Sequence, residues 1–204
     1  MQITIEEART LIAQQQIAHK LIAGFYQNVL ASFDRLTDKC GYKFSGWWPT
    51  LTDRPCQART NPSSKWIWDF LPLYASTFEY RMKEEPETSQ PGNCVLIFRL
   101  YCDEAFRSEN RTGHIDPVDL VSKEGCVELM VYRSLKSDPK KCFDIYGESE
   151  WPKPFNDGWQ KDICPPSMSV YYKRYPLEQF ISNQEDIQNQ LIQLTSADYV
   201  VPEI

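Results

Sequence analysis

Three segments of this chain have the side-chain pattern of strands in an antiparallel sheet, and they constrain its fold more than any other feature. In residues 66–82 aromatic side chains alternate with small or polar ones, which is typical of a strand with one face buried. Residues 94–102 are apolar apart from Arg99, which predicts a central strand buried on both faces. Residues 126–135 alternate again. The chain therefore indicates a globular protein built around a sheet.

Helical signals stand at both ends of the chain. Thr4 followed by Glu7 is a capping box, and it predicts a long amphipathic helix that ends near Gly41. Gln15 and His19 interrupt its apolar stripe, and a break near Gly24 would divide it into two packed helices. Close to the other terminus a second helix is expected to start at Pro176. Its inward stripe would be Phe180, Ile187, Leu191 and Leu194.

The segment between the last two predicted strands is long and irregular. Residues 136–168 contain five prolines and several large aromatic residues but no clear periodicity. Loops of this length inside a compact domain are usually functional or disordered. The aromatic residues favour an ordered loop, because they can anchor it to the body of the protein. We expect it to cover a sheet edge or the face opposite the helices.

These elements predict one α+β domain across residues 1–204. Its expected architecture is an antiparallel sheet of about five strands, with the long N-terminal helix and the C-terminal helix packed on one face. The helical segment at 1–41 and the loop at 136–168 are its two distinctive parts. Further elements expected are a short strand near residues 42–48, a strand at 169–175 and a short helix at 116–124.

Composition narrows the range of functions. A net charge of −6 and a pI near 5.1 argue against nucleic acid as a partner, because nucleic-acid binders need a cationic surface. No stretch approaches the ~20 apolar residues that cross a membrane. The seven cysteines are irregularly spaced and include no Cys-x-x-Cys pair, which favours reduced thiols and a cytoplasmic location.

The motifs of the common enzyme classes are absent from the sequence. There is no phosphate-binding Gly-x-x-x-x-Gly-Lys-[Ser/Thr] loop, no Gly-x-Gly-x-x-Gly turn and no Gly-x-Ser-x-Gly elbow. Clustered Cys and His pairs of the kind that hold zinc are absent as well. We therefore predict neither a cofactor nor a bound metal.

One enzymatic hypothesis remains, and it rests on acidic residues in or beside the predicted strands. Carboxylates that converge from neighbouring strands can hold a divalent metal for hydrolysis of a phosphodiester. The alternative is that these carboxylates form cross-strand ion pairs with nearby arginines. The residues of this hypothetical catalytic site are Glu79, Asp103 and Glu128, with Glu104 beside them and His114 as a further acid–base candidate.

The long loop carries the other candidate site. Large aromatic residues alternate there with turn-forming ones, and such aromatics are frequent hot spots of protein interfaces. An acidic rim would favour a partner with a basic patch. The same aromatics could instead pack beneath the loop, and Trp47 and Trp48 raise the same question. The residues predicted to bind a partner are Glu150, Trp151, Phe155, Asp157 and Trp159.

From these observations the sequence favours an acidic interaction module, acting as an inhibitor, an immunity-type protein or an accessory subunit. The alternative is the metal-dependent nuclease or other hydrolase described above. A third possibility is a sensor of a small ligand, with a pocket between the helices and the sheet, although no residue pattern selects its ligand.

Overall fold

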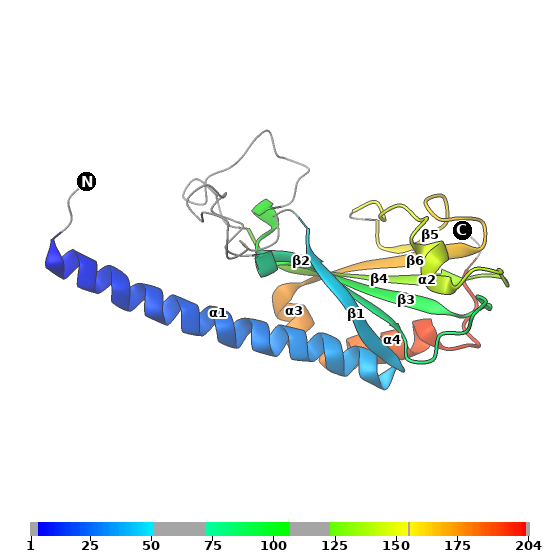
Figure 1. Cartoon of the computed structure of the whole chain (residues 1–204), viewed down its shortest axis with the longest axis horizontal. Helices are drawn as coiled ribbons and strands as arrows, with labels where there is room; N and C mark the ends of the chain where they lie inside the picture. Colours follow the sequence, from blue (N-terminus) through cyan, green and yellow to red (C-terminus); the bar gives the residue numbers. More distant parts are fainter. Residues whose placement is uncertain (1–3, 51–71, 107–122, 155, 203–204) are drawn as a thin grey trace.

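The computed structural model describes residues 4–50, 72–106, 123–154 and 156–202. It has the α+β architecture that the sequence predicts, with a long N-terminal helix, an antiparallel sheet and two C-terminal helices (Figure 1). Within these ranges the sheet has six strands, in the order β1-β2-β3-β4-β6-β5. The additional strand, β5, is a three-residue edge strand inside the long loop.

The described helices and strands follow one another along the chain with two short 3-10 helices between them. Most of the predicted short helix at 116–124 lies outside the described residues. Residues 66–71, the first part of the predicted strand at 66–82, lie outside them as well. The elements are α1 (Ile5–Lys39), β1 (Tyr42–Pro49), η3 (Pro72–Tyr74), β2 (Ala75–Met82), β3 (Cys94–Tyr101), η4 (Glu104–Phe106), β4 (Cys126–Ser134), α2 (Cys142–Tyr146), β5 (Gly158–Gln160), β6 (Met168–Pro176), α3 (Leu177–Ser182) and α4 (Gln184–Thr195).

The sheet has a hydrophobic layer on each of its faces. On the first face, Phe98 of β3 and Leu129 of β4 pack beneath α1, α3 and α4. On the second face, Ile97 and Met130 pack against α2. Neighbouring strand residues point to opposite faces, so a central strand buried on both sides is apolar almost throughout. This explains the composition of β3.

The helix α1 is continuous over 35 residues, without a break at Gly24. Its capping box forms as predicted, because the Thr4 side chain accepts a hydrogen bond from the Glu7 backbone and the Glu7 carboxylate accepts one from Thr4 N, at 2.7 Å. Among its large apolar residues only Val29, Phe33 and Leu36 are buried. The expectation of a helix laid across the sheet is met from Phe25 onward, because Phe25 and Tyr26 already pack against the hydrophobic layer of the first face. The part of α1 before them projects beyond the sheet (Figure 1).

The C-terminal helical segment begins after Pro176, as expected, but it forms two helices. The chain bends at Asn183, which ends α3 and precedes α4. The predicted inward stripe survives this bend, because each helix turns its own part of the stripe toward the first face. Its four residues, Phe180, Ile187, Leu191 and Leu194, are all buried.

Part of the long loop covers the second face of the sheet. Within it, α2 places Ile145 and Tyr146 over the strands, and the Tyr146 ring meets Tyr132 at 4.7 Å between centroids. The cysteines among the described residues are all free thiols. None of the helices in the described part of the chain has both the length and the apolar character needed to cross a bilayer.

Candidate functional site

The predicted carboxylate cluster is dispersed in the fold. Glu79 on β2 and Glu128 on β4 are buried on the second face. They lie two strands apart and two positions out of register, which places their Cα atoms about 12 Å apart by standard sheet spacings. Asp103 follows β3 and accepts backbone hydrogen bonds from Ala105 at 2.8 Å and Lys123 at 2.9 Å. His114 lies outside the described residues.

Arginine side chains occupy the space between these carboxylates. Arg99 lies on β3, and its guanidinium is 3.3 Å from the Glu128 carboxylate. Tyr172 donates a second hydrogen bond to Glu128 at 2.8 Å. The Trp151 ring covers the guanidinium of Arg99, whose Cζ lies 4.1 Å from the ring centroid. This cation–π contact brings together one residue from each of the two predicted sites.

The other carboxylates of the hypothesis also face arginines. Arg81 lies 3.5 Å from Glu79 and stacks its guanidinium on Phe143, while Glu104 forms an ion pair with Arg174. No cluster of three His, Cys, Asp or Glu side chains that could hold a metal exists in the described part of the chain. The observed contacts are those of a charge-balanced ion-pair network on the second face.

The aromatic residues of the long loop lie on opposite faces of the sheet. Trp151 covers Arg99 on the second face and is 43% exposed. Trp159 packs against the hydrophobic layer of the first face, where it stacks on Tyr199 and donates to the Tyr199 hydroxyl at 3.1 Å. The two indoles therefore do not belong to one continuous patch.

The remaining predicted residues of the loop hold its backbone in place. The Asp157 carboxylate accepts a hydrogen bond from the Arg174 backbone at 3.3 Å. The backbone of Glu150 bonds to Ile163, and its carbonyl accepts a hydrogen bond from the Tyr132 hydroxyl. Phe155 lies outside the described residues. Glu150 itself is exposed, so its side chain is free to contribute negative charge to this surface.

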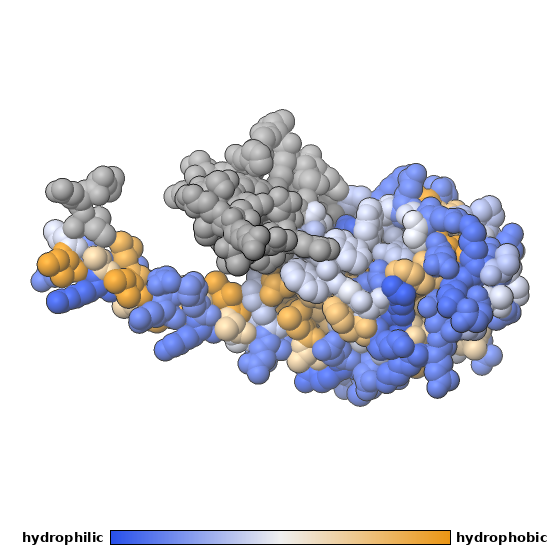
Figure 2. All heavy atoms as spheres, in the orientation of Figure 1, coloured by the Kyte–Doolittle hydropathy of each residue, from blue (hydrophilic) through white to orange (hydrophobic). Residues whose placement is uncertain are grey.

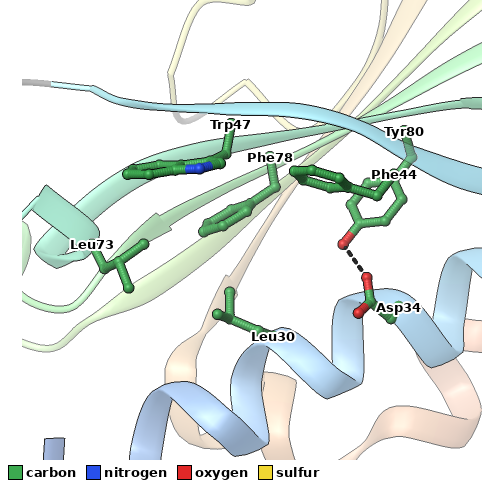
Figure 3. A pocket seen from close by; sticks show the side chains of 7 residues that line it. All are labelled: Leu30, Asp34, Phe44, Trp47, Leu73, Phe78 and Tyr80. Atoms are coloured by element: carbon green, nitrogen blue, oxygen red, sulfur yellow. Dashed lines mark hydrogen bonds between the residues drawn. The ribbon is translucent and has the colours of Figure 1, made fainter. Parts of the chain in front are cut away.

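A second aromatic site lies between α1 and the edge of the sheet (Figure 3). It is a pocket of about 580 Å³, which we call the aromatic groove. One wall is helical and the others come from the edge strand β1, its neighbour β2 and the 3-10 turn before β2. Its lining residues are Leu30, Asp34, Phe44, Trp47, Leu73, Phe78 and Tyr80.

A β-bulge in β1 creates the groove. Phe44 pairs with Tyr80 and Trp47 pairs with Phe78, and the strand register shifts by one residue at Ser45. Strict alternation would send the side chains of residues 44 and 47 to opposite faces. The extra residue of the bulge turns both aromatics toward α1 instead, so they stand side by side over the groove in Figure 3.

The floor of the groove is firmly held while its rim is open. The Tyr80 hydroxyl donates to Asp34 Oδ1 at 2.8 Å and so ties β2 to α1. Burial, and then this hydrogen bond, raise the pKa of Tyr80 far above its ordinary value, so it remains a neutral donor. Phe44 packs edge-on against Tyr80. Phe44 is nevertheless 50% exposed and Trp47 40% exposed.

The groove has the chemistry of a binding surface. Among the described lining residues there is no nucleophile and no acid–base pair, since Asp34 is the one carboxylate in that set and Tyr80 stays protonated. No ion pair joins Asp34 to a cation in the described ranges of the chain, and the adjacent Arg35 donates to Ser32 instead.

Sequence reasoning raised Trp47 as a question but missed Phe44 and Asp34. The local signal was the glycine at position 46, because a glycine inside a strand pattern often marks a bulge. The approach of α1 to β1 depends on tertiary packing, which no local pattern reports.

Comparison with known proteins places the chain in a family without adding a function. Searches of curated proteins and of solved structures found no match for the chain. A family model described as PM0109 matches residues 6–197. This match extends from the first turn of α1 to the end of α4 and includes both aromatic sites. The chain therefore belongs to the PM0109 family.

Proposed function

We propose that this protein is an interaction module, acting as an inhibitor, an immunity-type protein or an accessory subunit, and that it binds its partner through the aromatic groove. The observation that supports this proposal is the exposure of Phe44 and Trp47 at the rim of an apolar pocket. Exposed apolar surface of this kind usually marks a contact site. Tryptophan in particular contributes much of the binding energy of protein interfaces.

Charge defines the expected partner more closely. Asp34 stands at the helical side of the groove, where its carboxylate already accepts the Tyr80 hydroxyl and has a second oxygen to offer. The whole chain carries a net charge of −6. We therefore expect the partner to insert a large aliphatic or aromatic side chain beside a lysine or arginine, and its basic surface to accelerate the encounter. The free thiols support a cytoplasmic location as part of this proposal.

A small apolar ligand is the second candidate for the groove. Its volume of about 580 Å³ lies within the usual range of ligand pockets, ~300–1,000 Å³. Such pockets, however, usually bury most of the ligand and offer several convergent polar groups. This groove lies at the sheet edge with half-exposed walls, and its described residues include a single carboxylate, which fits a protruding side chain better.

The proposal can be tested with a library of random displayed peptides selected against the whole chain. We expect the selected peptides to share an aromatic or aliphatic residue next to a basic one. Trp47→Ala should weaken their binding at least tenfold, since truncation of a hot-spot tryptophan costs about 2 kcal/mol or more. Asp34→Asn should weaken the basic peptides and leave neutral variants of them unchanged.

Trp151→Ala is the matched control, because Trp151 has nearly the same exposure as Trp47 but lies on the opposite face of the sheet. Loss of peptide binding in Trp151→Ala, with Trp47→Ala unaffected, would transfer the binding site to the long loop. Selection of no peptide, together with saturable binding of an apolar dye that Trp47→Ala abolishes, would favour the small-ligand candidate.

A further inference from the structure

The first half of α1 has no partner within the described part of the chain. Residues 5–22, which we call the free half of α1, include no buried residue. Hydrophobic side chains nevertheless gather on it at its start and again near the sheet, with a hydrophilic stretch between (Figure 2). Its exposed large apolar residues are Ile5, Leu11, Ile12, Ile17, Leu21 and Ile22, at 37–73% of their full exposure.

A helical segment like this is hard to sustain in isolation. Eighteen residues span about 27 Å, and helices near this length are only marginally stable in water without packing. Side-chain ion pairs give little support, since only Glu6 and Arg9 are oppositely charged at a spacing of three or four residues. The free half therefore needs a surface to pack against.

The spacing of the seam in the free half continues into the stripe that packs on the sheet, with Gln15 and His19 as two polar positions within it. Positions three and four residues apart follow one another along the whole helix, which is the spacing of a coiled-coil seam. The last of them, Val29, Phe33 and Leu36, are buried against the first face. The preceding positions of this seam are Ile5, Ala8, Ile12, Gln15, His19, Ile22 and Tyr26.

This seam is self-complementary when it is reversed about its midpoint, between residues 13 and 14. Reversal places Ile5 opposite Ile22, the small Ala8 opposite the large His19, and Ile12 opposite Gln15 at the centre. It also brings the acidic Glu7 to the level of Lys20, so the charges complement one another. We propose that two copies of this chain associate through the free halves of α1, paired antiparallel about a two-fold axis.

A pocket at the root of the free half supports this pairing. It measures about 340 Å³. Its lining residues are Leu21, Ile22, Phe25 and Tyr26 of α1, together with Tyr74, Cys102 and Leu177 of the body. Antiparallel pairing brings Ile5 of the second copy to the level of Ile22, at the mouth of this pocket. An isoleucine side chain fits within it, and the two folded bodies lie at opposite ends of the paired helices.

The charges on the free half disfavour a membrane surface as the occupant of the seam. Helices that lie in a lipid interface usually carry many lysines and arginines on their polar face. The free half carries two acidic residues, Glu6 and Glu7, against Arg9 and Lys20. Its formal charge is therefore balanced. A second copy of the chain would cover the apolar seam and would also place Lys20 beside Glu7.

The direct experiment is sedimentation of the whole chain over a wide concentration range, with two matched variants. We expect a dimer for the wild type. Ile12→Asp should weaken it at least tenfold, because a carboxylate would be buried in the seam. Ile17→Asp makes the same chemical change at a similarly exposed position on the other side of the helix, and it should leave the dimer intact.

Cross-linking under mild oxidation tests the direction of pairing. Residues 5 and 22 of one helix are separated by about 25 Å, so they cannot form a bond within one chain. Because the free thiol of Cys102 lines the pocket that receives residue 5, these variants also carry Cys102→Ser. On that background the double variant Ile5→Cys, Ile22→Cys should form covalent dimers, and Ile5→Cys alone should not. Efficient self-linking of Ile5→Cys would establish parallel helices and overturn the antiparallel arrangement.

Two further results would overturn the proposal. A wild type that remains monomeric at every concentration would exclude self-association, and flotation of that monomer with anionic lipid vesicles would assign the seam to a membrane. A dimer that Ile12→Asp does not weaken would place the contact elsewhere. Both results test the seam alone. Trp47 lines the aromatic groove and is not part of the seam, so the test of the groove with Trp47→Ala can succeed or fail separately.

Discussion

Two arginines on opposite faces of the sheet, Arg133 and Arg99, show how differently the regions around them are held together. Arg133 is buried, and the Arg99 side chain is 13% exposed. Arg133 on the first face is 3% exposed and donates to backbone carbonyls where α4 ends. Its shortest bonds go to Leu194 at 3.1 Å and to Ser196 and Tyr199 at 2.9 Å. No carboxylate in the described ranges pairs with it, so carbonyl dipoles at a helix C-terminus balance its charge.

Arg99 on the second face is balanced by side chains instead. Its partners are the carboxylate of Glu128 and the ring of Trp151, and its Nε has no hydrogen-bond partner in the described part of the chain. Arg133 therefore fastens the C-terminal segment through the fixed backbone, whereas Arg99 depends on groups that can be replaced or moved. The comparison predicts a rigid region around Arg133 and a more adaptable one around Arg99.

The first prediction concerns Arg133 and has the largest expected effect. Arg133→Met should lower the free energy of unfolding by about 3–5 kcal/mol, because it leaves several buried carbonyls without donors. The stability of Arg133→Lys should fall between that of the wild type and that of Arg133→Met, since an ammonium cannot reproduce the planar fork of a guanidinium. Urea unfolding measures both. Wild-type stability in Arg133→Lys would show that one charge is enough and would remove this contrast.

The second prediction tests the ion pair of the other region. Glu128→Gln should cost about 2–4 kcal/mol, because the charge of Arg99 stays buried without its counterion. The double variant Arg99→Met, Glu128→Leu should lose much less than the sum of the two single changes. A double-mutant cycle by urea unfolding gives the coupling. Strict additivity would mean that Arg99 and Glu128 do not depend on each other.

The third prediction concerns the pH dependence of folding stability, which we expect to be set in part by a thiol beside Arg133. Burial raises the pKa of the neighbouring Cys94 thiol above its ordinary 9.0, and the Arg133 guanidinium opposes this only in part. The folded state keeps this thiol protonated. Its contribution to stability is therefore complete below pH 9 and declines above it, by at most about 1.4 kcal/mol per pH unit. Stability at pH 8 and pH 10 should differ less in Cys94→Ala than in the wild type, and equal slopes would contradict the prediction.

The fold could be predicted from the sequence where its causes are local. The capping box at Thr4 and the alternation along β4 act through neighbouring residues, so they predicted a helix start and a strand. The three-residue strand β5 was missed, because it is stabilised mainly by pairing with β6. The helix over residues 5–22 was predicted, but its extension beyond the sheet was missed, since its apolar stripe has the same spacing whether or not a sheet lies beneath it.

The candidate sites depended more on tertiary structure. Glu79 and Glu128 were expected to converge. In the fold they are separated by Arg99, which lies on the strand between them. Trp151 and Trp159 are eight positions apart in one loop, yet the loop carries them to opposite faces. Such separations arise from strand order and loop path. The bulge at Ser45 has a local cause instead, because the glycine next to it is a sequence signal for a bulge.

The smallest effect is expected for the indole that covers Arg99. Trp151 is 43% exposed, so its removal should cost only about 0.5–1 kcal/mol, the usual value of a cation–π contact near the surface. Trp159→Ala should cost more, since it loses packing on Tyr171 and Tyr199 and a hydrogen bond. Thermal unfolding of the two variants compares them directly. A cost for Trp151→Ala as large as that for Trp159→Ala would make the Arg99 region as rigid as the Arg133 region, and Trp151 would then no longer serve as a control for the aromatic groove.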